Sequence, residues 1–289
     1  MGNGTSDKRH PFFRAVWWVS NFLLILSLVA VAWTGVWEYS VRKYLQGFSD
    51  AIVPEASSSQ EKAEAILAWM RNGPPRLEAA RPADLSPHDP TDTLNYHELL
   101  QVCGSATNAF LNLSRSAGFE ARRLLLLTPE RTAKHVVAEV HLGDRWVIVD
   151  PTYRVFLRDA QGNFLTRGEL QNPKVFNEAI GLIPNYPPEY SYERFTHVRV
   201  AALPLVGSLI RRTLNSTLPG WDEYLDWNLL LERRSFLSLF LAVNALFFFL
   251  LWRIFLAWLA DNRLRVPRFH FRANLIRATA AFFTSPEIK

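Results

Sequence analysis

Two long apolar segments limit what this chain can fold into. The first, Ala15–Trp37, contains no charged residue and is long enough, at about 1.5 Å per residue, to cross a bilayer as one helix. The second, Ser235–Trp252, is expected to continue past Arg253 to Ala260, because an arginine near a helix end can extend its charged group to the interface. A cleaved signal peptide fits the first segment less well, since its apolar run is too long and no small-x-small cleavage site follows. The sequence therefore predicts transmembrane helices at 15–37 and 235–260.

Basic residues outside the two segments predict their orientation. Three precede the first segment and five follow the second: Lys8, Arg9, Arg14, Arg263, Arg265, Arg268, Arg272 and Arg277. By the positive-inside rule, residues 1–14 and 261–289 are cytoplasmic and residues 38–234 lie outside. The net charge of +5 comes largely from arginines near the chain ends, and no basic block with interleaved aromatics indicates nucleic-acid binding. We therefore expect a two-pass protein of the cytoplasmic (inner) membrane that contacts lipid and binds no nucleic acid.

The only cysteine of the chain, Cys103, lies at the start of a predicted helix. The apolar residues after it recur at helical spacing and end at a glycine: Ala106, Phe110, Leu113, Ala117 and Gly118. A thiol at a helix N-terminus faces unsatisfied N–H groups and the positive end of the helix dipole, which favour the thiolate. The same N–H groups can hold an oxyanion. A lone cysteine is also commonly buried and inert, so position alone leaves both interpretations open.

A predicted hairpin brings His135 next to Asp150. Two segments read as strands joined by a two-residue turn signal: residues 135–142, residues 145–150 and Gly143-Asp144 between them. This turn sets Val137 opposite Asp150, so His135 lies on the same face one diagonal step away, about 7 Å. A three-residue turn would shift the register by one residue and separate the pair.

Together, Cys103, His135 and Asp150 have the residue types of a nucleophile, a base and an orienting carboxylate. A carboxylate fixes the tautomer of a histidine and makes it a better base. With a cysteine at a helix start, this is the general Cys-His-Asp arrangement for acyl transfer. The alternative is a strand histidine that is satisfied by a nearby acid while the cysteine lies elsewhere.

The motifs around these residues resemble the core of the transglutaminase-like superfamily, relatives of the papain-like cysteine proteases. Four motifs carry the resemblance: the cysteine of VCGSATNAF, the run Gly118–Arg122, His135 with Glu139, and Trp146 with Asp150-Pro151-Thr152. The resemblance covers roughly residues 60–155. It implies an α+β fold in which an antiparallel sheet packs on the cysteine-bearing helix, here flanked by two transmembrane helices. It also implies Cys103 as nucleophile, His135 as base and Asp150 as orienter.

Other side chains of this region have predicted supporting roles. Gln101 and His97 are candidates for the oxyanion site, whereas Glu139 and Trp146 are expected on the face of the sheet that carries the site. The sequence departs from the family at Val137, where members often carry an aromatic residue. A metal site built from His135, Glu139 and His141 lacks the H-E-x-x-H spacing, so we expect no metal and no cofactor.

The other segments are predicted to connect or support these elements. Glu38–Gly47 can extend the first helix, Gln60–Arg71 reads as an amphipathic helix, Phe156–Leu165 as a hairpin and Arg194–Leu205 as a strand. Residues 48–60, 74–95 and 181–192 read as loops. The last of these is rich in proline and tyrosine and could cover a cleft, contact a partner or face solvent. Leu218–Leu231 and the basic segment Phe269–Phe283 are expected at the membrane surface, and Asn244 is expected to contact the first span or a partner subunit.

Two classes of function fit this sequence. The first is a membrane-anchored cysteine acyltransferase, amidase or peptidase that acts outside the cytoplasmic membrane on a protein, peptide or envelope polymer. The second is a non-catalytic accessory subunit of a cell-envelope or exopolysaccharide synthesis or export complex, in which the transmembrane helices contact another membrane protein. A two-span transporter component fits less well, because too few charged residues lie in the spans to line a path.

Overall fold

The computed structural model describes residues 11–54, 57–130, 132–197, 207–219, 221, 230 and 232–264. The chain divides into two compact units, one of residues 34–240 and one of residues 1–33 with 241–289. The predicted helix Phe269–Phe283, most of the segment Leu218–Leu231 and the end of the strand predicted at Arg194–Leu205 lie outside the described residues.

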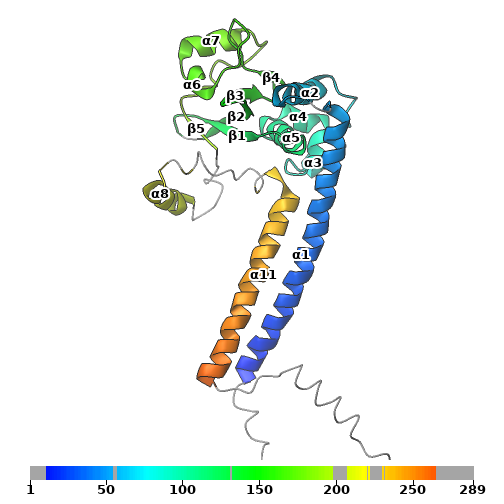
Figure 1. The fold of residues 1–289 in the computed structure, drawn as a ribbon, viewed down its shortest axis with the longest axis vertical. Helices are drawn as coiled ribbons and strands as arrows, with labels where there is room; N and C mark the ends of the chain where they lie inside the picture. Colours follow the sequence, from blue (N-terminus) through cyan, green and yellow to red (C-terminus); the bar gives the residue numbers. More distant parts are fainter. Residues whose placement is uncertain are drawn as a thin grey trace, which may run out of the picture. The chain divides into compact units, whose positions relative to one another are not determined.

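Among the described residues, two helices are long and apolar enough to cross a membrane: α1 (Pro11–Ile52) and α11 (Arg234–Leu259), which continues as a π-helical turn, η4 (Ala260–Leu264) (Figure 1). The 42 residues of α1 span about 60 Å, roughly twice the hydrocarbon core of a bilayer. The prediction of a loop at 48–60 was therefore wrong for residues 48–52, which belong to α1. The helix continues because Leu45 is fully buried in the domain core and Phe48 and Ile52 pack against that core.

Polar side chains join α1 and α11 within the unit of residues 1–33 and 241–289. Arg253 Nε donates to Asn21 Oδ1 at 2.7 Å, and its guanidinium lies over the Trp17 ring. Between the adjacent residues of the two helices, Trp252 Nε1 donates to Ser20 Oγ at 3.1 Å. The charge of Arg253 thus has partners on the other helix, in addition to the interface contact expected from the sequence.

The unit of residues 34–240 is built around an antiparallel sheet with the strand order β4-β3-β2-β1-β5 (Figure 1). The strands are β1 (Ala121–Leu127), β2 (Ala133–Leu142), β3 (Arg145–Asp150), β4 (Val155–Phe156) and β5 (Phe195–Thr196). Each strand pairs with its neighbour in antiparallel fashion. Of the strand predicted at Arg194–Leu205, the described part forms only the two residues of β5.

Alternation along the strands creates two hydrophobic layers. On one face, the helix α5 (Cys103–Ser116) and the helix α2 (Ser59–Asn72) pack against a layer that includes Ala138, Val140, Val147 and Val149. On the other face, Leu124, Val137 and Ile148 pack against α6 (Arg167–Leu170), α7 (Pro173–Gly181) and residues of the loop that follows α7. The mixed α+β architecture expected from the sequence is confirmed.

The amphipathic helix α2 forms as predicted. Its buried residues are Ala63, Ile66, Leu67 and Met70, the apolar face expected from their spacing. Its start is fixed by a capping box, in which Ser58 and Glu61 exchange hydrogen bonds between side chain and backbone.

The region predicted as the loop 74–95 contains two short helices, η2 (Pro82–Asp84) and α3 (Pro90–Asn95), and α4 (His97–Gln101) follows it. The prediction missed a local start signal for α3. The Asp89 side chain accepts a hydrogen bond from the Thr91 N–H, and Pro90 occupies the first turn. The expectation of an uninterrupted loop was therefore wrong.

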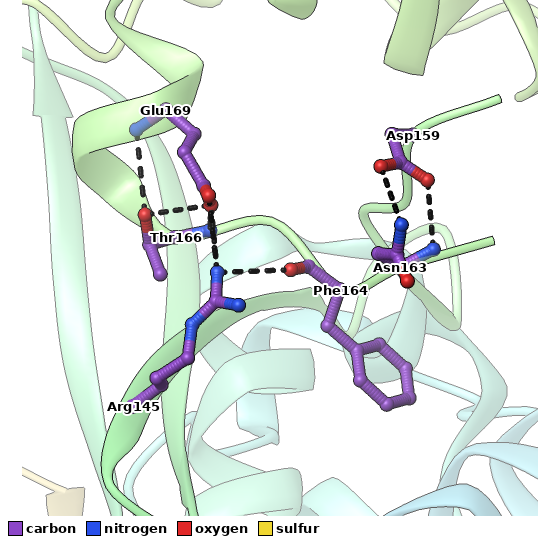
Figure 2. A network of polar contacts seen from close by, with 6 residues as sticks. All are labelled: Arg145, Asp159, Asn163, Phe164, Thr166 and Glu169. Carbon is purple, nitrogen blue, oxygen red and sulfur yellow. Dashed lines mark hydrogen bonds and ion pairs between the residues drawn. The ribbon is translucent and has the colours of Figure 1, made fainter. Parts of the chain in front are cut away.

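The segment after β4 turns back on itself and leads into α6. Leu165 N–H donates to Leu157 O, and the Asp159 carboxylate accepts from the Asn163 backbone and side chain, which closes the predicted hairpin (Figure 2). The Arg145 guanidinium donates to the Glu169 carboxylate at 2.9 Å and to the Phe164 carbonyl (Figure 2). A separate helix, α8, spans Gly207–Thr217.

Candidate active site

Cys103 occupies the first position of α5, and neighbouring polar contacts hold this end of the helix. Ser105 Oγ donates to Leu99 O at 2.7 Å, which ties the first turn to α4. Thr107 Oγ1 donates to Val136 O at 3.1 Å, which ties the helix to β2 next to His135. The N-cap residue, Val102, has no side-chain acceptor and so does not cap the first turn of α5.

The β2–β3 hairpin has the register predicted from its two-residue turn. Leu142 pairs with Arg145 and Ala138 with Val149, and the left-handed conformation of Gly143 (φ 64°) allows the tight reversal. One further step along this register sets Val137 opposite Asp150. His135 Nε2 lies 2.7 Å from Asp150 Oδ2, so the predicted contact between these side chains is confirmed.

The Asp150 carboxylate is completely buried and accepts four hydrogen bonds. Its Oδ1 accepts from the backbone N–H groups of Thr152 (3.0 Å) and Tyr153 (3.3 Å). Its Oδ2 accepts from His135 Nε2 and from the Tyr186 hydroxyl, which lies at 3.0 Å. Because the backbone turn that follows β3 supplies two of these donors, the carboxylate is held in one orientation toward His135.

Aromatic rings enclose the His135 imidazole. Tyr190 stacks on the imidazole with a centroid distance of 4.1 Å and an interplanar angle of 8°, and the Tyr153 and Tyr186 rings meet it edge-on. Burial raises the pKa of Tyr186 far above its ordinary value, and the neighbouring Tyr192 and Asp150 raise it further. Tyr186 therefore keeps its proton and acts as a donor to Asp150.

Cys103 and His135 lie close enough that each shifts the pKa of the other. Since Nε2 is engaged by Asp150, Nδ1 is the ring nitrogen left for the sulfur. The hydrogen bond to His135 lowers the pKa of Cys103, and although burial opposes this, the backbone N–H groups of Val136 and Gly104 lower it further. Burial disfavours the charged ring, yet the hydrogen bonds and charges of Asp150 and Cys103 raise the pKa of His135 to about 9. These two pKa shifts favour a thiolate–imidazolium pair.

The model of the transglutaminase-like superfamily matches residues 46–151, a range that contains Cys103, His135 and Asp150. Residues 46–151 form a transglutaminase-like domain. The match begins within α1, earlier than the limit of residue 60 expected from the motifs. No match was found among curated proteins or among solved structures.

Within the transglutaminase-like domain, Glu139 and Trp146 lie on the same face of the sheet as His135. Glu139 Oε2 accepts from Arg122 Nε at 2.6 Å and lies 2.9 Å from His197 Nε2. Burial raises the pKa of Glu139, but His197 and Arg122 outweigh it and the pKa is lowered. The Arg122 guanidinium also lies over the Trp146 ring at 4.1 Å. Glu139 is therefore engaged in a buried ion pair beside the site, and no metal-binding group of three or more His, Cys, Asp or Glu occurs among the described residues.

The two oxyanion candidates from the sequence lie together on α4. The Gln101 amide nitrogen is 3.0 Å from His97 Nε2, and both side chains are exposed. Their role at the oxyanion stays a prediction.

Tyr186, Tyr190 and His197 contribute to the site but were not assigned to it from the sequence. The tyrosines come from the proline- and tyrosine-rich segment 181–192, for which covering a cleft was one of three interpretations. This segment packs on the site residues, because Tyr190 stacks on His135 and Tyr186 bonds to Asp150. The family often carries an aromatic residue at the position of Val137. Here the aromatic ring beside His135 comes from Tyr190 instead.

Proposed function

We propose that the transglutaminase-like domain is a cysteine-dependent enzyme of acyl transfer or amide hydrolysis. Cys103 is the nucleophile, His135 the general base and acid, and Asp150 the residue that orients His135. The observation that carries the proposal is the buried His135 Nε2–Asp150 Oδ2 hydrogen bond of 2.7 Å, on a ring that also lowers the pKa of the chain's only cysteine. Cys103 then supplies an activated sulfur, and the neighbouring His135 supplies a proton donor.

The proposed reaction has two steps. The Cys103 sulfur attacks the carbonyl carbon of a carboxamide or peptide, and His135 gives its proton to the leaving amine as the C–N bond breaks, which leaves a thioester. Water or a second amine then attacks the thioester while His135 takes the proton from the attacking group, and the C–S bond breaks to release the Cys103 thiolate. Water gives hydrolysis and an amine gives a cross-link. The N–H groups of the first turn of α5, with Gln101 and His97 as further donors, stabilise the oxyanion.

We further propose that α1 and α11 anchor the domain at the outer face of the cytoplasmic membrane. The basic residues before α1 and after α11 support this orientation through the positive-inside rule. The substrate is then a protein, a peptide or an envelope polymer. Because the chain has a single cysteine, a membrane-impermeant maleimide applied to intact cells reports the side on which Cys103 lies. Labelling of intact cells is expected; labelling only after permeabilisation would overturn the orientation.

Alkylation of the purified full chain by iodoacetamide tests the thiol chemistry. The label can enter only at Cys103, so total incorporation measures the reactivity of one sulfur. We expect fast labelling near neutral pH that is lost in His135→Ala, because the ring hydrogen bond is the main cause of the lowered thiol pKa. His141→Ala is the matched control, since His141 lies on the same strand and pairs with Glu120 instead. Wild-type labelling no faster than that of a free thiol would refute the proposal.

An accessory, non-catalytic role in envelope assembly remains the alternative function. Complementation in cells separates it from the enzyme. Full function of Cys103→Ala would support the accessory role and end the case for thiol chemistry, whereas loss of function with normal protein levels would support the enzyme.

A further inference from the structure

A pocket lies between α2, the start of β4 and the end of α7, on residues for which the proposed thiol chemistry has no use. Its volume is about 360 Å³, within the range of small-molecule sites. Apolar side chains from all three elements form most of its wall: Leu67, Ala68, Val155, Phe156, Ala179, Leu182 and Ile183. The charged residues at the pocket are Glu64, Arg71, Arg154 and Arg158.

The pocket carries more positive charge than its acidic residue can neutralise. Arg158 Nη2 is paired with Glu64 Oε1 at 2.8 Å, so these two charges cancel. Arg71 and Arg154 pair with no carboxylate of the described residues, and they donate to backbone oxygens instead. Arg71 Nη2 donates to Arg154 O at 2.7 Å, and Arg154 Nε donates to Met70 O at 3.1 Å. Each guanidinium therefore keeps N–H groups that are free to bind a ligand.

The two guanidinium groups are close enough to affect each other. Burial lowers the pKa of Arg154, and the charge of Arg71 lowers it further. An anion between like charges relieves this repulsion and can accept several of the remaining N–H groups at once.

The backbone of Arg154 also favours a specific role for this residue. Its φ of 59° is a left-handed conformation that costs a non-glycine residue about 1 kcal/mol. Glycine or asparagine would adopt this conformation with less strain, yet the position carries a long basic side chain at the pocket wall.

We propose that this pocket binds a small ligand that carries one oxyanion, a carboxylate or a phosphate, on a short apolar group. Arg154 and Arg71 bind the oxyanion, and the apolar wall formed by α2, β4 and α7 covers the rest of the ligand. The site is distinct from the contact between Cys103 and His135, and the binding does not require that Cys103 be a nucleophile.

Isothermal titration of the full chain in detergent micelles tests this site. N-acetyl-leucine, its neutral amide, butyl phosphate and inorganic phosphate are the probes. N-acetyl-leucine or butyl phosphate should bind at least about ten-fold more tightly than N-acetyl-leucinamide, because the amide lacks the charge that the arginines recognise. Whichever of the two charged probes binds more tightly identifies the kind of oxyanion. Inorganic phosphate should bind more weakly than either, because it makes no contact with the apolar wall.

Three variants attribute the binding to these residues. Arg154→Gly removes the guanidinium and relieves the left-handed strain, and it should weaken binding by at least about ten-fold. Arg71→Gln should also weaken binding, and it provides the test if Arg154→Gly does not fold. Arg145→Gln is the matched control and should change affinity by less than about two-fold, because Arg145 is exposed and already paired with Glu169 (Figure 2).

Four results would overturn the proposal. The first is that neither charged probe binds, and the second is that N-acetyl-leucine and butyl phosphate bind no more tightly than the neutral amide. The third is that inorganic phosphate binds as tightly as the charged probes. The fourth is that Arg145→Gln weakens binding as much as Arg154→Gly or Arg71→Gln. Cys103→Ala should bind the probes like the wild type, so failure of the proposed thiol chemistry leaves this test unaffected.

Discussion

Replacing Asp150 with asparagine should move the proton on the His135 ring to the wrong nitrogen. The carboxylate accepts from the backbone N–H groups of Thr152 and Tyr153 at one oxygen, and from His135 and the Tyr186 hydroxyl at the other. Asparagine has only one side-chain oxygen. That oxygen must face the backbone N–H groups of Thr152 and Tyr153, because these donors are fixed in the turn. The asparagine NH2 group then faces Nε2, which must accept, so the neutral ring carries its proton on Nδ1, the nitrogen left for the sulfur.

The size of the effect follows from the pKa of the thiol. With Nδ1 protonated in a neutral ring, His135 can no longer take the proton of Cys103, and the thiol pKa returns toward its ordinary value of 9.0. At pH 7 a thiol of pKa 9.0 is about 1% thiolate, so ionisation alone accounts for a loss of about 100-fold relative to a fully ionised thiol. A more basic thiolate is also a stronger nucleophile, which offsets part of this loss. We therefore expect alkylation to slow by about ten-fold.

The pH dependence of iodoacetamide labelling distinguishes this cause from misfolding. In the wild type the pKa of His135 is raised to about 9 and that of Cys103 is lowered, so the labelling rate should change little from neutral pH to about pH 9. In Asp150→Asn the rate should keep rising through pH 9, as it does for a free thiol. Asp144→Asn, the same chemical change in the exposed hairpin turn, should behave like the wild type. An Asp150→Asn protein with the wild-type rate and profile would refute the reasoning.

Three further changes test the surrounding structure. Tyr186→Phe removes one donor to the buried Asp150 carboxylate and should lower the free energy of unfolding by about 1–3 kcal/mol in chemical denaturation; an unchanged value would contradict the hydrogen bond. Glu38→Gln leaves the buried Arg233 without the carboxylate that accepts its hydrogen bond at 2.7 Å. The change should lower the free energy of unfolding by about 3–5 kcal/mol, again measured by chemical denaturation. A decrease below about 1 kcal/mol would mean that the pair is solvated. Gly104→Ala meets no atom within 4 Å of the added Cβ and should stabilise the helix by up to about 1 kcal/mol; a lower melting temperature would show that the site needs glycine there.

The Glu38 network has no counterpart in the expectations from the sequence. The Arg233 side chain is buried and bound to Glu38. Ser235 Oγ donates to the other Glu38 oxygen at 2.8 Å. No periodicity could predict this contact, because Glu38 and Arg233 are 195 residues apart in the chain.

The sequence by itself determined the features that depend on local chemistry. Apolar length predicts the two long helices, and a two-residue turn with glycine dictates the register that brings His135 to Asp150, because pairing must continue outward from the turn residue by residue. The spacing of Ala63, Ile66, Leu67 and Met70 likewise predicts the buried face of α2.

Only the tertiary structure decided which distant residues complete these elements. It brought Tyr186 and Tyr190 from a loop onto Asp150 and His135, and it extended α1 through Ile52 by packing this end of the helix into the core. It also placed Arg71 beside Arg154 at a pocket wall. These side chains are far apart in the chain and come together because whole hydrophobic layers are buried. Local patterns of turns and periodicity do not predict such long-range contacts.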